Sequence, residues 1–430
     1  MSPTSTSEVV TPTDRRHLSG LLSRERRVIA RGLGRSYGDA AQLGGGTVID
    51  MTGITGVWLD AATGTVIAGA GTSLGRIIDT VLPSGWFLPV TPGTRYVTVG
   101  GAIAADVHGK NHHRHGSFGQ YVTSFDLITE DGAAITATPG TDVFAATVGG
   151  MGLTGTISRA TLRLIPVESS WMRVDTGKGG DLDSVMDMLE AADDRSTYSV
   201  AWVDLTRSGR GRGVVSAAEH ATHDETRAKH RLTRSKGISV SPPPGMPRVV
   251  TQRTVDAFNR LWYAKAPSEE TGKLEPLDSF FYPLDRVSSW NRLYGRHGFL
   301  QYQFVLPEGR EDSLLAIAGA LAETSTPLAL AVLKRMGPSR GGLLSFPMPG
   351  WTLAVDMPLG DPGLAEVLDG CDQIVAGSGG RVYLAKDSRL TAEPAHEMYP
   401  QLGRWRQIRS ALDPTGRWAS NLSQRLGLTG

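Results

Sequence analysis

The sequence predicts an α+β fold, in which a glycine-rich N-terminal part is followed by antiparallel strands mixed with helices. Two observations lead to this class. Short β-branched runs separated by glycines fill the N-terminal part, and amphipathic helical segments alternate with apolar strands further along. At 430 residues the chain is too long for one ordinary core, so more than one domain is expected.

The elements expected in the N-terminal part follow from local patterns. The first dozen residues are polar and rich in Ser and Thr, and we expect them to be disordered. The runs "RVIA", "GTVIDM", "VWLD" and "GTVIAGAG" predict short strands. Apolar residues at helical spacing, ended by Pro83 and Gly85, predict a helix within 73–85. Residues 121–138 predict a hairpin with a Glu-Asp-Gly turn, and residues 152–169 a strand.

The composition then changes. Residues 181–193 predict an amphipathic helix, 197–205 a strand, and 364–380 a helix closed by glycines; "GFLQYQFVLP" and "WTLAVDMPL" predict further strands. Residues 207–247 are basic and predict a loop, either a solvated insertion or a mobile lid that faces a membrane.

Charge and cysteine content limit the function. The net charge of +1 gives no case for nucleic acid as a partner. A single cysteine, Cys371, excludes an intramolecular disulfide and a thiolate metal cluster, and it suits a cytoplasmic location. The sequence shows no signal peptide and no run of 18 apolar residues, so we expect at most peripheral contact with a membrane.

Several glycine loops are candidates for binding a phosphate group. "RGLGRSYGD" (31–39) places glycines at 32, 34 and 38, which differs from the GxGxxG spacing of a Rossmann turn. "PGT", "TVGG" and "GGMGLTG" follow it. Backbone N–H groups of such loops can hold a pyrophosphate, although ordinary turns in a glycine-rich sheet are the alternative.

The segment "GGAIAADVHGKNHH" (100–113) is dense in histidine and could be a metal site, a catalytic site or a cofactor wall. No HExxH or paired-cysteine motif accompanies it, which disfavours metal. Its glycines and small residues favour a wall against which a cofactor packs.

The segments "IARGLGRSYGDAAQLGGGTVIDM", "LPVTPGTRYVTVGGAIAADVHGKNHH", "GSFGQYV", "GGMGLTG", "GFLQYQF", "SFPMPGW" and "VYLAKDSR" occur in this order. Together they resemble the decaprenylphosphoryl-β-D-ribose 2-oxidase family, the oxidase half of a 2'-epimerase, among FAD enzymes of the vanillyl-alcohol oxidase type. The resemblance implies a two-part FAD-binding domain and a substrate domain with an antiparallel sheet. The implied boundaries are 1–167 for the FAD-binding domain, 168–380 for the substrate-binding domain and 381–430 for a C-terminal return that completes the first.

The resemblance also implies which residues bind the cofactor. They are Ala30, Arg31, Gly32, Leu33, Gly34, Arg35, Ser36, Tyr37, Gly38, Asp39, Gly93, Thr98, Val99, Gly100, Gly101, Ala105, Asp106, His108, Gly155, Ile157 and Tyr383. Covalent members of the superfamily carry a histidine in the first glycine loop, where this chain has Arg35. Non-covalent FAD is therefore expected.

The implied chemistry is the oxidation of a sugar hydroxyl, with hydride transfer to flavin N5. Lys386, His108 and Tyr383 are the candidate catalytic residues. Lys386 would polarise the hydroxyl and balance charge on the reduced flavin, unless it forms a surface salt bridge with Asp387. His108 either assists proton transfer or packs against the ring as a fixed donor.

The implied substrate residues are Lys110, Gln301, Gln303, Lys334, Thr352 and Ala354. The two lysines are candidates for meeting a phosphate. Thr352 and Ala354 stand where the family has Asn and Cys, so the substrate side departs from the family more than the FAD side.

Two enzymatic interpretations therefore stay open. One is oxidation of the 2'-OH of a polyprenylphosphoryl ribofuranose in cell-wall synthesis, with an NAD(P)H-dependent reductase as the partner that completes the epimerisation. The other is oxidation of a different sugar or nucleoside in antibiotic biosynthesis. A flavin-binding scaffold without activity is the non-enzymatic alternative.

Overall fold

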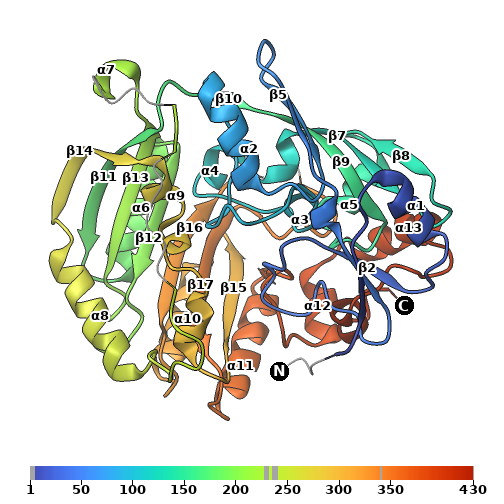
Figure 1. Cartoon of the computed structure of the whole chain (residues 1–430). Coiled ribbons are helices and arrows are strands. Elements are labelled where there is room, and N and C mark those ends of the chain that lie inside the picture. The colour runs from blue at the N-terminus through green and yellow to red at the C-terminus, as the bar shows by residue number, and fades with distance from the viewer. Residues whose placement is uncertain (1–4, 227–231, 235–240, 339–340, 430) are drawn as a thin grey trace.

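The computed structural model of the chain describes residues 5–226, 232–234, 241–338 and 341–429. Helices and antiparallel sheets occur together, which confirms the predicted α+β class. The N-terminal and C-terminal segments, blue and red in Figure 1, share one side of the molecule, and the green and yellow segments form the other.

The N-terminal part contains two small sheets. The first is parallel, in the order β1 (Glu8–Val10), β3 (Thr47–Asp50) and β2 (Val28–Arg31). The second is antiparallel, in the order β4 (Val57–Asp60), β5 (Thr65–Gly69), β9 (Thr156–Arg163), β7 (Val122–Ile128) and β8 (Ala134–Ala137). β6 (Trp86–Phe87) pairs with β10 (Ile165–Pro166). The predicted strands, the 73–85 helix and the 121–138 hairpin are confirmed, the helix as α2 (Leu74–Val81).

The expectation of disorder through the first dozen residues is wrong for the part that the structure describes. Glu8–Val10 form β1, an edge strand that pairs with β3 in parallel register. Val9 is exposed, so the strand is held by backbone hydrogen bonds and not by burial of apolar side chains. The polar composition of this segment is therefore the reason that the strand was not predicted. Residues 1–4 lie outside the described residues.

The second body is built on one antiparallel sheet. Its order is β14 (Glu269–Pro276), β11 (Trp171–Gly179), β13 (Gly213–His220), β12 (Tyr198–Val203), β16 (Leu330–Met336), β17 (Gly350–Pro358), β15 (Phe299–Pro307) and β18 (Arg381–Val382). The helix α6 (Leu182–Arg195) contacts β12 and β13, while α10 (Glu311–Ala322) and α11 (Leu364–Gly377) contact β15. An apolar core lies between the sheet and these helices, and a second core fills the N-terminal part.

The prediction that residues 207–247 form a loop is wrong over Gly213–His220, which form β13 near the centre of the sheet. The strand contains Val214 and Val215 but otherwise small or polar residues, and residues 204–212 separate it from its partner β12, so no short hairpin turn indicated it. A short helix, α7 (His223–Thr226), follows. Residues 227–231 and 235–240 of this segment lie outside the described residues.

The C-terminal segment returns to the N-terminal part. It contains α12 (Ala392–Met398), α13 (Leu402–Leu412) and α14 (Asn421–Arg425). The helix α13 contacts α5 (Asp142–Thr147), and the indole of Trp405 donates to the carbonyl of Ala146 over 2.8 Å. The backbone N–H of Ala419 donates to Val28. These contacts support the division at 167 and 380, which stays a prediction.

The remaining α-helices are α1 (Arg15–Leu22), α3 (Val99–Ala104), α4 (His112–His115), α8 (Gln252–Lys265) and α9 (Leu277–Phe281). The 3₁₀ turns are η1 (Met51–Gly53), η2 (Leu82–Ser84), η3 (Phe118–Tyr121), η5 (Pro283–Arg286) and η6 (Trp290–Tyr294). No helix among the described residues is both long enough and apolar enough to cross a bilayer.

Candidate active site

One face of the large sheet carries a group of buried and half-buried polar side chains. In the register of β15, β16 and β17, Gln301 lies opposite Asp356, Gln303 opposite Ala354, and Lys334 opposite Thr352. Directly opposed residues share a face. The other face is turned toward α11, where the hydroxyl of Tyr302 donates to Asp372 over 2.9 Å. Polar groups buried away from the helices indicate a ligand site, because burying them without a partner is costly.

His108 follows α3 and reaches this polar face. Its Nε2 lies 3.0 Å from Nε2 of Gln303, and its Nδ1 lies 3.3 Å from Nζ of Lys334. Burial, and then the charge of Lys334, hold the pKa of His108 well below its usual range. The imidazole is therefore neutral at physiological pH, and both ring nitrogens have a protein partner.

Lys386 is half-buried beside the same face, near Asp356 and Lys334. Its Nζ lies 3.7 Å from the centroid of the Tyr37 ring, which is a cation–π geometry. Its side chain forms no hydrogen bond or ion pair with another residue that the structure describes. The alternative of a surface salt bridge with Asp387 is wrong, because Asp387 pairs with Arg425. Burial lowers the pKa of Lys386 to about 7, with Asp356 opposing the shift and Lys334 adding to it.

Asp356 is a site residue that sequence reasoning missed. It is buried, accepts a hydrogen bond from the amide of Gln301, and interacts with the hydroxyl of Tyr294. Burial raises the pKa of Asp356 to about 6. The missed signal was strand alternation: Asp356 follows Thr352 and Ala354 at a spacing of two, so it shares their face.

Lys110 and Lys334 add positive charge to the site. Nζ of Lys110 donates to the carbonyl of Phe280 and lies 4.1 Å from the centroid of its ring. Burial lowers the pKa of Lys110 to about 7, with Lys334 adding to the shift, and burial lowers the pKa of Lys334 to about 8. With Lys386, these lysines outnumber the buried carboxylate of Asp356. Such an excess of lysines favours an anionic ligand, because a nearby negative charge would raise the lysine pKa values and keep the amines protonated.

The loop of residues 31–39 fits a pyrophosphate. No described residue accepts a hydrogen bond from the backbone N–H groups of residues 33–36. Gly34 has a φ of 62°, so consecutive N–H groups can converge as an anion nest. The loop also packs closely on its neighbours: a Cβ on Gly32 would lie 2.2 Å from Oγ1 of Thr98, and one on Gly38 would lie 1.7 Å from the carbonyl of Asp387.

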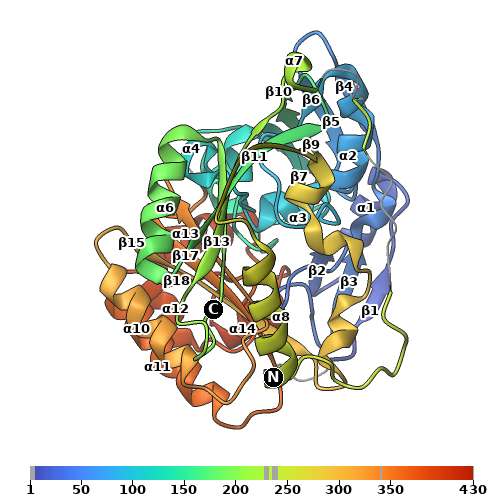
Figure 2. The same cartoon turned by 90° about the vertical axis from the view of Figure 1, so that its left-hand side faces the viewer.

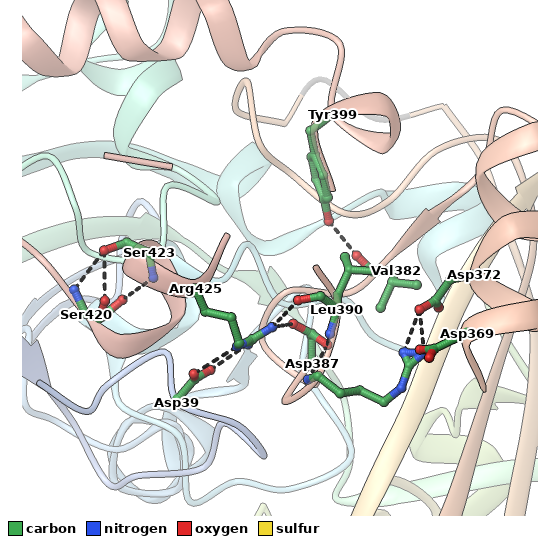
Figure 3. Close-up of polar contacts among 11 residues, drawn as sticks. Asp39, Asp369, Asp372, Val382, Asp387, Leu390, Tyr399, Ser420, Ser423 and Arg425 are labelled. Atoms are coloured by element: carbon green, nitrogen blue, oxygen red, sulfur yellow. Dashed lines mark hydrogen bonds and ion pairs between the residues drawn. The ribbon is translucent and has the colours of Figure 1, made fainter. Parts of the chain in front are cut away.

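The carboxylates of Asp39 and Asp106 hold loops in place. Asp39 accepts from Arg425, which also binds Asp387, so Arg425 joins the first glycine loop to the residue after Lys386 (Figure 3). Asp106 has a φ of 41° and accepts hydrogen bonds from three groups. These are the hydroxyls of Ser117 and Ser345 and the N–H of Gly119. Both carboxylates therefore bind protein groups and hold these loops in position.

Tyr383 lies between the sheet and the loop that follows α3. Its N–H donates to Gln303, and its hydroxyl donates to Ala105 over 2.9 Å. Its ring stacks on Phe346 with centroids 4.5 Å apart and lies 5.6 Å from the His108 ring. The fold therefore brings Tyr383 and His108 together.

The other predicted cofactor residues lie around these loops. The side chain of Thr98 caps α3, which contains Val99, Gly100 and Gly101. Ile157 is in β9, and Gly155, just before it, has a φ of 146°. A Cβ on Gly93 would meet no protein atom within 4 Å.

The histidines of residues 108–115 do not form one cluster. Nδ1 of His113 lies 3.3 Å from the carboxylate of Asp193, and Nδ1 of His115 lies 2.7 Å from the hydroxyl of Tyr121. His112 is buried, and neither of its ring nitrogens forms a hydrogen bond with a residue that the structure describes. Within the described ranges, no three His, Cys, Asp or Glu side chains are arranged to hold a metal ion.

Comparison with known proteins gives matches along most of the chain. A family model described as an FAD binding domain matches residues 7–138, and one described as D-arabinono-1,4-lactone oxidase matches residues 359–426. A decaprenylphosphoryl-β-D-ribose oxidase from Mycolicibacterium smegmatis is 42% identical over 414 residues, which cover 94% of this chain and 90% of that protein. A Streptomyces coelicolor protein described as an uncharacterized protein in the mprA 5' region is 39% identical, covering 83% of this chain and 100% of that protein. An L-gulono-1,4-lactone dehydrogenase from Mycobacterium tuberculosis is 24% identical, covering 98% of this chain and 96% of that protein.

Proposed function

The chain belongs to the decaprenylphosphoryl-β-D-ribose oxidase family, and from this premise we propose that it oxidises the 2'-hydroxyl of a polyprenylphosphoryl ribofuranose to the ketone. The chain is an FAD-dependent oxidoreductase, and FAD when bound supplies the acceptor for the hydride that leaves the carbinol carbon. The observation that carries the proposal is the half-buried amine of Lys386, which lies over the Tyr37 ring and makes no hydrogen bond to another described residue.

Lys386 is the group that takes the hydroxyl proton. With a pKa near 7 a substantial fraction of the amine is neutral at physiological pH, so Nζ can accept a proton as the carbinol carbon loses its hydride. The ammonium that results leaves a positive charge in a buried site. That charge offsets the negative charge that the reaction develops there.

His108 acts as a fixed positioning group and not as a proton carrier. Both of its ring nitrogens are within hydrogen-bond distance of a protein partner, Gln303 on one side and Lys334 on the other. A ring with a partner at each nitrogen keeps a fixed orientation toward a ligand. This favours the second of the two roles that the sequence leaves open.

Lys110 and Lys334 bind the phosphate of the substrate. Both are half-buried and have lowered pKa values, so an anion between them restores two charged ammonium groups in a site of low dielectric. Gln301, Gln303, Thr352 and Ala354 line the face where the sugar would lie. Thr352 is tied to the strand, because its hydroxyl donates to the carbonyl of Phe304 over 2.8 Å.

FAD is bound without a covalent bond to the chain. Residues 33–36 offer unpaired N–H groups for its pyrophosphate, and Arg35 in that loop is exposed and donates to the carbonyl of Leu33. Acid precipitation tests this point: the yellow colour should stay in the supernatant, and colour that stays with the precipitate contradicts it.

A second candidate function is the oxidation of another sugar or nucleoside. It is favoured by Thr352 and Ala354, because both lie on the polar face that contacts a substrate and neither is the residue implied by the family resemblance. For the first candidate function, the chemistry points to two partners. A ketone at C2' requires an NAD(P)H-dependent reductase to complete an epimerisation, and a prenyl substrate requires peripheral contact with a membrane.

Anaerobic reduction of the bound flavin separates these functions. Prenylphosphoryl ribose should bleach the flavin absorbance, while free pentoses and nucleosides should not. Bleaching by a nucleoside alone supports the second candidate, and no bleaching by any of them supports a flavin-binding scaffold.

A further inference from the structure

The helix α8 presents large apolar side chains to solvent. Phe258, Leu261 and Trp262 are 54%, 55% and 51% exposed, and the rings of Phe258 and Trp262 stack with centroids 6.0 Å apart. Their spacing of three and four residues places them on one face of the helix. We call these three residues the α8 face. A contiguous apolar patch of this kind indicates an interaction surface.

The α8 face is not needed to hold the helix on the protein. The adjacent strip of the helix does this, where Val255 and Asn259 are buried and the amide of Asn259 donates to Asp204 over 2.9 Å. Tyr263 is held between Lys178 and Arg212, with its hydroxyl 3.3 Å from the carbonyl of Gly179. A capping box of Thr251 and Thr254 fixes the N-terminus.

Lys265 extends the α8 face at its C-terminal end, and Arg253 and Arg260 lie on a separate ridge of the same helix. Arg253, Arg260 and Lys265 are exposed on the same helix, and none forms an ion pair with a carboxylate in the part of the chain that the structure describes. The one acidic residue of the helix, Asp256, accepts a hydrogen bond from Gln252. Aromatic and leucine side chains bordered by unpaired cations are typical of helices that lie in the headgroup region of an anionic bilayer.

We infer that α8 docks the protein on an anionic lipid surface, with the α8 face inserted among the lipids. A second copy of the chain is a less suitable occupant, because it would bring the same unpaired cations face to face. The inference rests on the proposed function for one point only, that the substrate carries a prenyl chain.

The start of α8 lies beside the candidate active site. The N–H groups of Val249 and Val250 both donate to the carbonyl of Leu293 in η6. In the same turn, Trp290 lies 6.3 Å from the ring of Tyr37, the ring over which Lys386 sits. A bilayer on α8 would therefore hold lipid-bound substrate near the entrance to the site.

Vesicle co-sedimentation tests the inference. The holoenzyme is mixed with vesicles of phosphatidylcholine and phosphatidylglycerol, and the triple variant F258S/L261S/W262S is compared with Trp58→Ser. Trp58 is 66% exposed on β4, and Figures 1 and 2 place the β4–β5 hairpin at the opposite end of the molecule from α8. We expect the triple variant to lose about tenfold or more in vesicle affinity and the Trp58 variant to keep the wild-type affinity.

The charge contribution is tested separately with R253E/R260E. This variant should lose vesicle binding, and wild-type binding should fall as salt is raised. Equal binding by the wild type and the triple variant overturns the inference. The inference is also overturned if the wild type does not bind the vesicles and instead forms a dimer that depends on Phe258.

A turnover measurement separates this inference from the proposed function. With long-chain prenylphosphoryl ribose in vesicles, the triple variant should lose turnover about tenfold, while with a short-chain soluble analogue it should match the wild type. If the wild type binds vesicles through α8 but does not oxidise either substrate, the proposed function fails and the docking surface stands. Equal turnover by both proteins on the vesicle substrate contradicts the docking surface.

Discussion

Nζ of Lys386 lies 3.7 Å from the centroid of the Tyr37 ring. Tyr37 belongs to the first glycine loop and Lys386 to the C-terminal return, so their contact forms only when the chain ends fold together. Arg425 secures the arrangement by binding Asp39 and Asp387, each close in sequence to one of the two residues (Figure 3). The site therefore depends on contacts at both ends of the chain.

Replacing Lys386 should stop the chemistry without displacing the cofactor. Lys386→Met removes the proposed proton acceptor but keeps the apolar stem over Tyr37. We expect FAD content to be unchanged and single-turnover flavin reduction to slow by about a hundredfold or more. Lys386→Arg keeps a cation that cannot be neutral, so it should be as slow as the Met variant. Wild-type rates in either variant contradict the assignment.

The pH dependence of turnover should report the pKa of Lys386. The neutral amine is the active form, so kcat should fall as the pH drops below about 7. Asp356→Asn removes a charge that raises the pKa of Lys386, so the fall should move to lower pH. Lys334→Met removes a charge that lowers the pKa of Lys386, so the fall should move to higher pH. Shifts in the same direction for both variants would rule out the opposite effects assigned to Asp356 and Lys334 on the pKa of Lys386.

Gly93→Ala tests where the cofactor lies. A Cβ at this position meets no protein atom, so the variant should fold with unchanged thermal stability in the absence of FAD but bind FAD more weakly, by about tenfold. Gly180→Ala is the matched control, because its Cβ also meets open space and it lies far from the glycine loops in sequence. Unchanged FAD affinity in the Gly93 variant removes this residue from the proposed site.

Arg425→Met should destabilise the protein by about 3 kcal/mol, because it leaves two buried carboxylates without their shared partner. Arg404→Met is the control, since Arg404 and Asp142 form an exposed ion pair worth less than about 1 kcal/mol. Chemical denaturation of the two holoproteins measures the difference, and equal midpoints would contradict the role given to Arg425.

Local chemistry explains which elements were predictable. The hairpin of β7 and β8 was evident because its turn is self-contained: Gly132 has a φ of 78°, and Asp131 accepts from the N–H of Ala133. The strand β1 was missed because its partner β3 is distant in sequence. The strand β13 was missed because the long loop 204–212 separates it from β12, and its other partner, β11, is more distant. Pairing of that kind leaves no local pattern.

The residues of the candidate site were likewise predictable only in part. His108 and Lys386 lie in recognisable motifs, and the fold brings both to one face of the sheet. Asp356 lies on a strand whose other polar residues were noticed, yet its role depends on Lys386, which comes from another part of the chain. The α8 face was missed because its residues have an ordinary helical spacing, and only the structure places them outward.

Anaerobic flavin reduction in the stopped flow tests the claim that Lys386 is the base in the oxidation of a phosphorylated prenyl sugar. With prenylphosphoryl ribose, the wild type should bleach its flavin rapidly, and Lys386→Met should bind the same substrate with similar affinity but bleach about a hundredfold more slowly. Equal bleaching by the two proteins, or no bleaching of the wild type by this substrate, would contradict the claim.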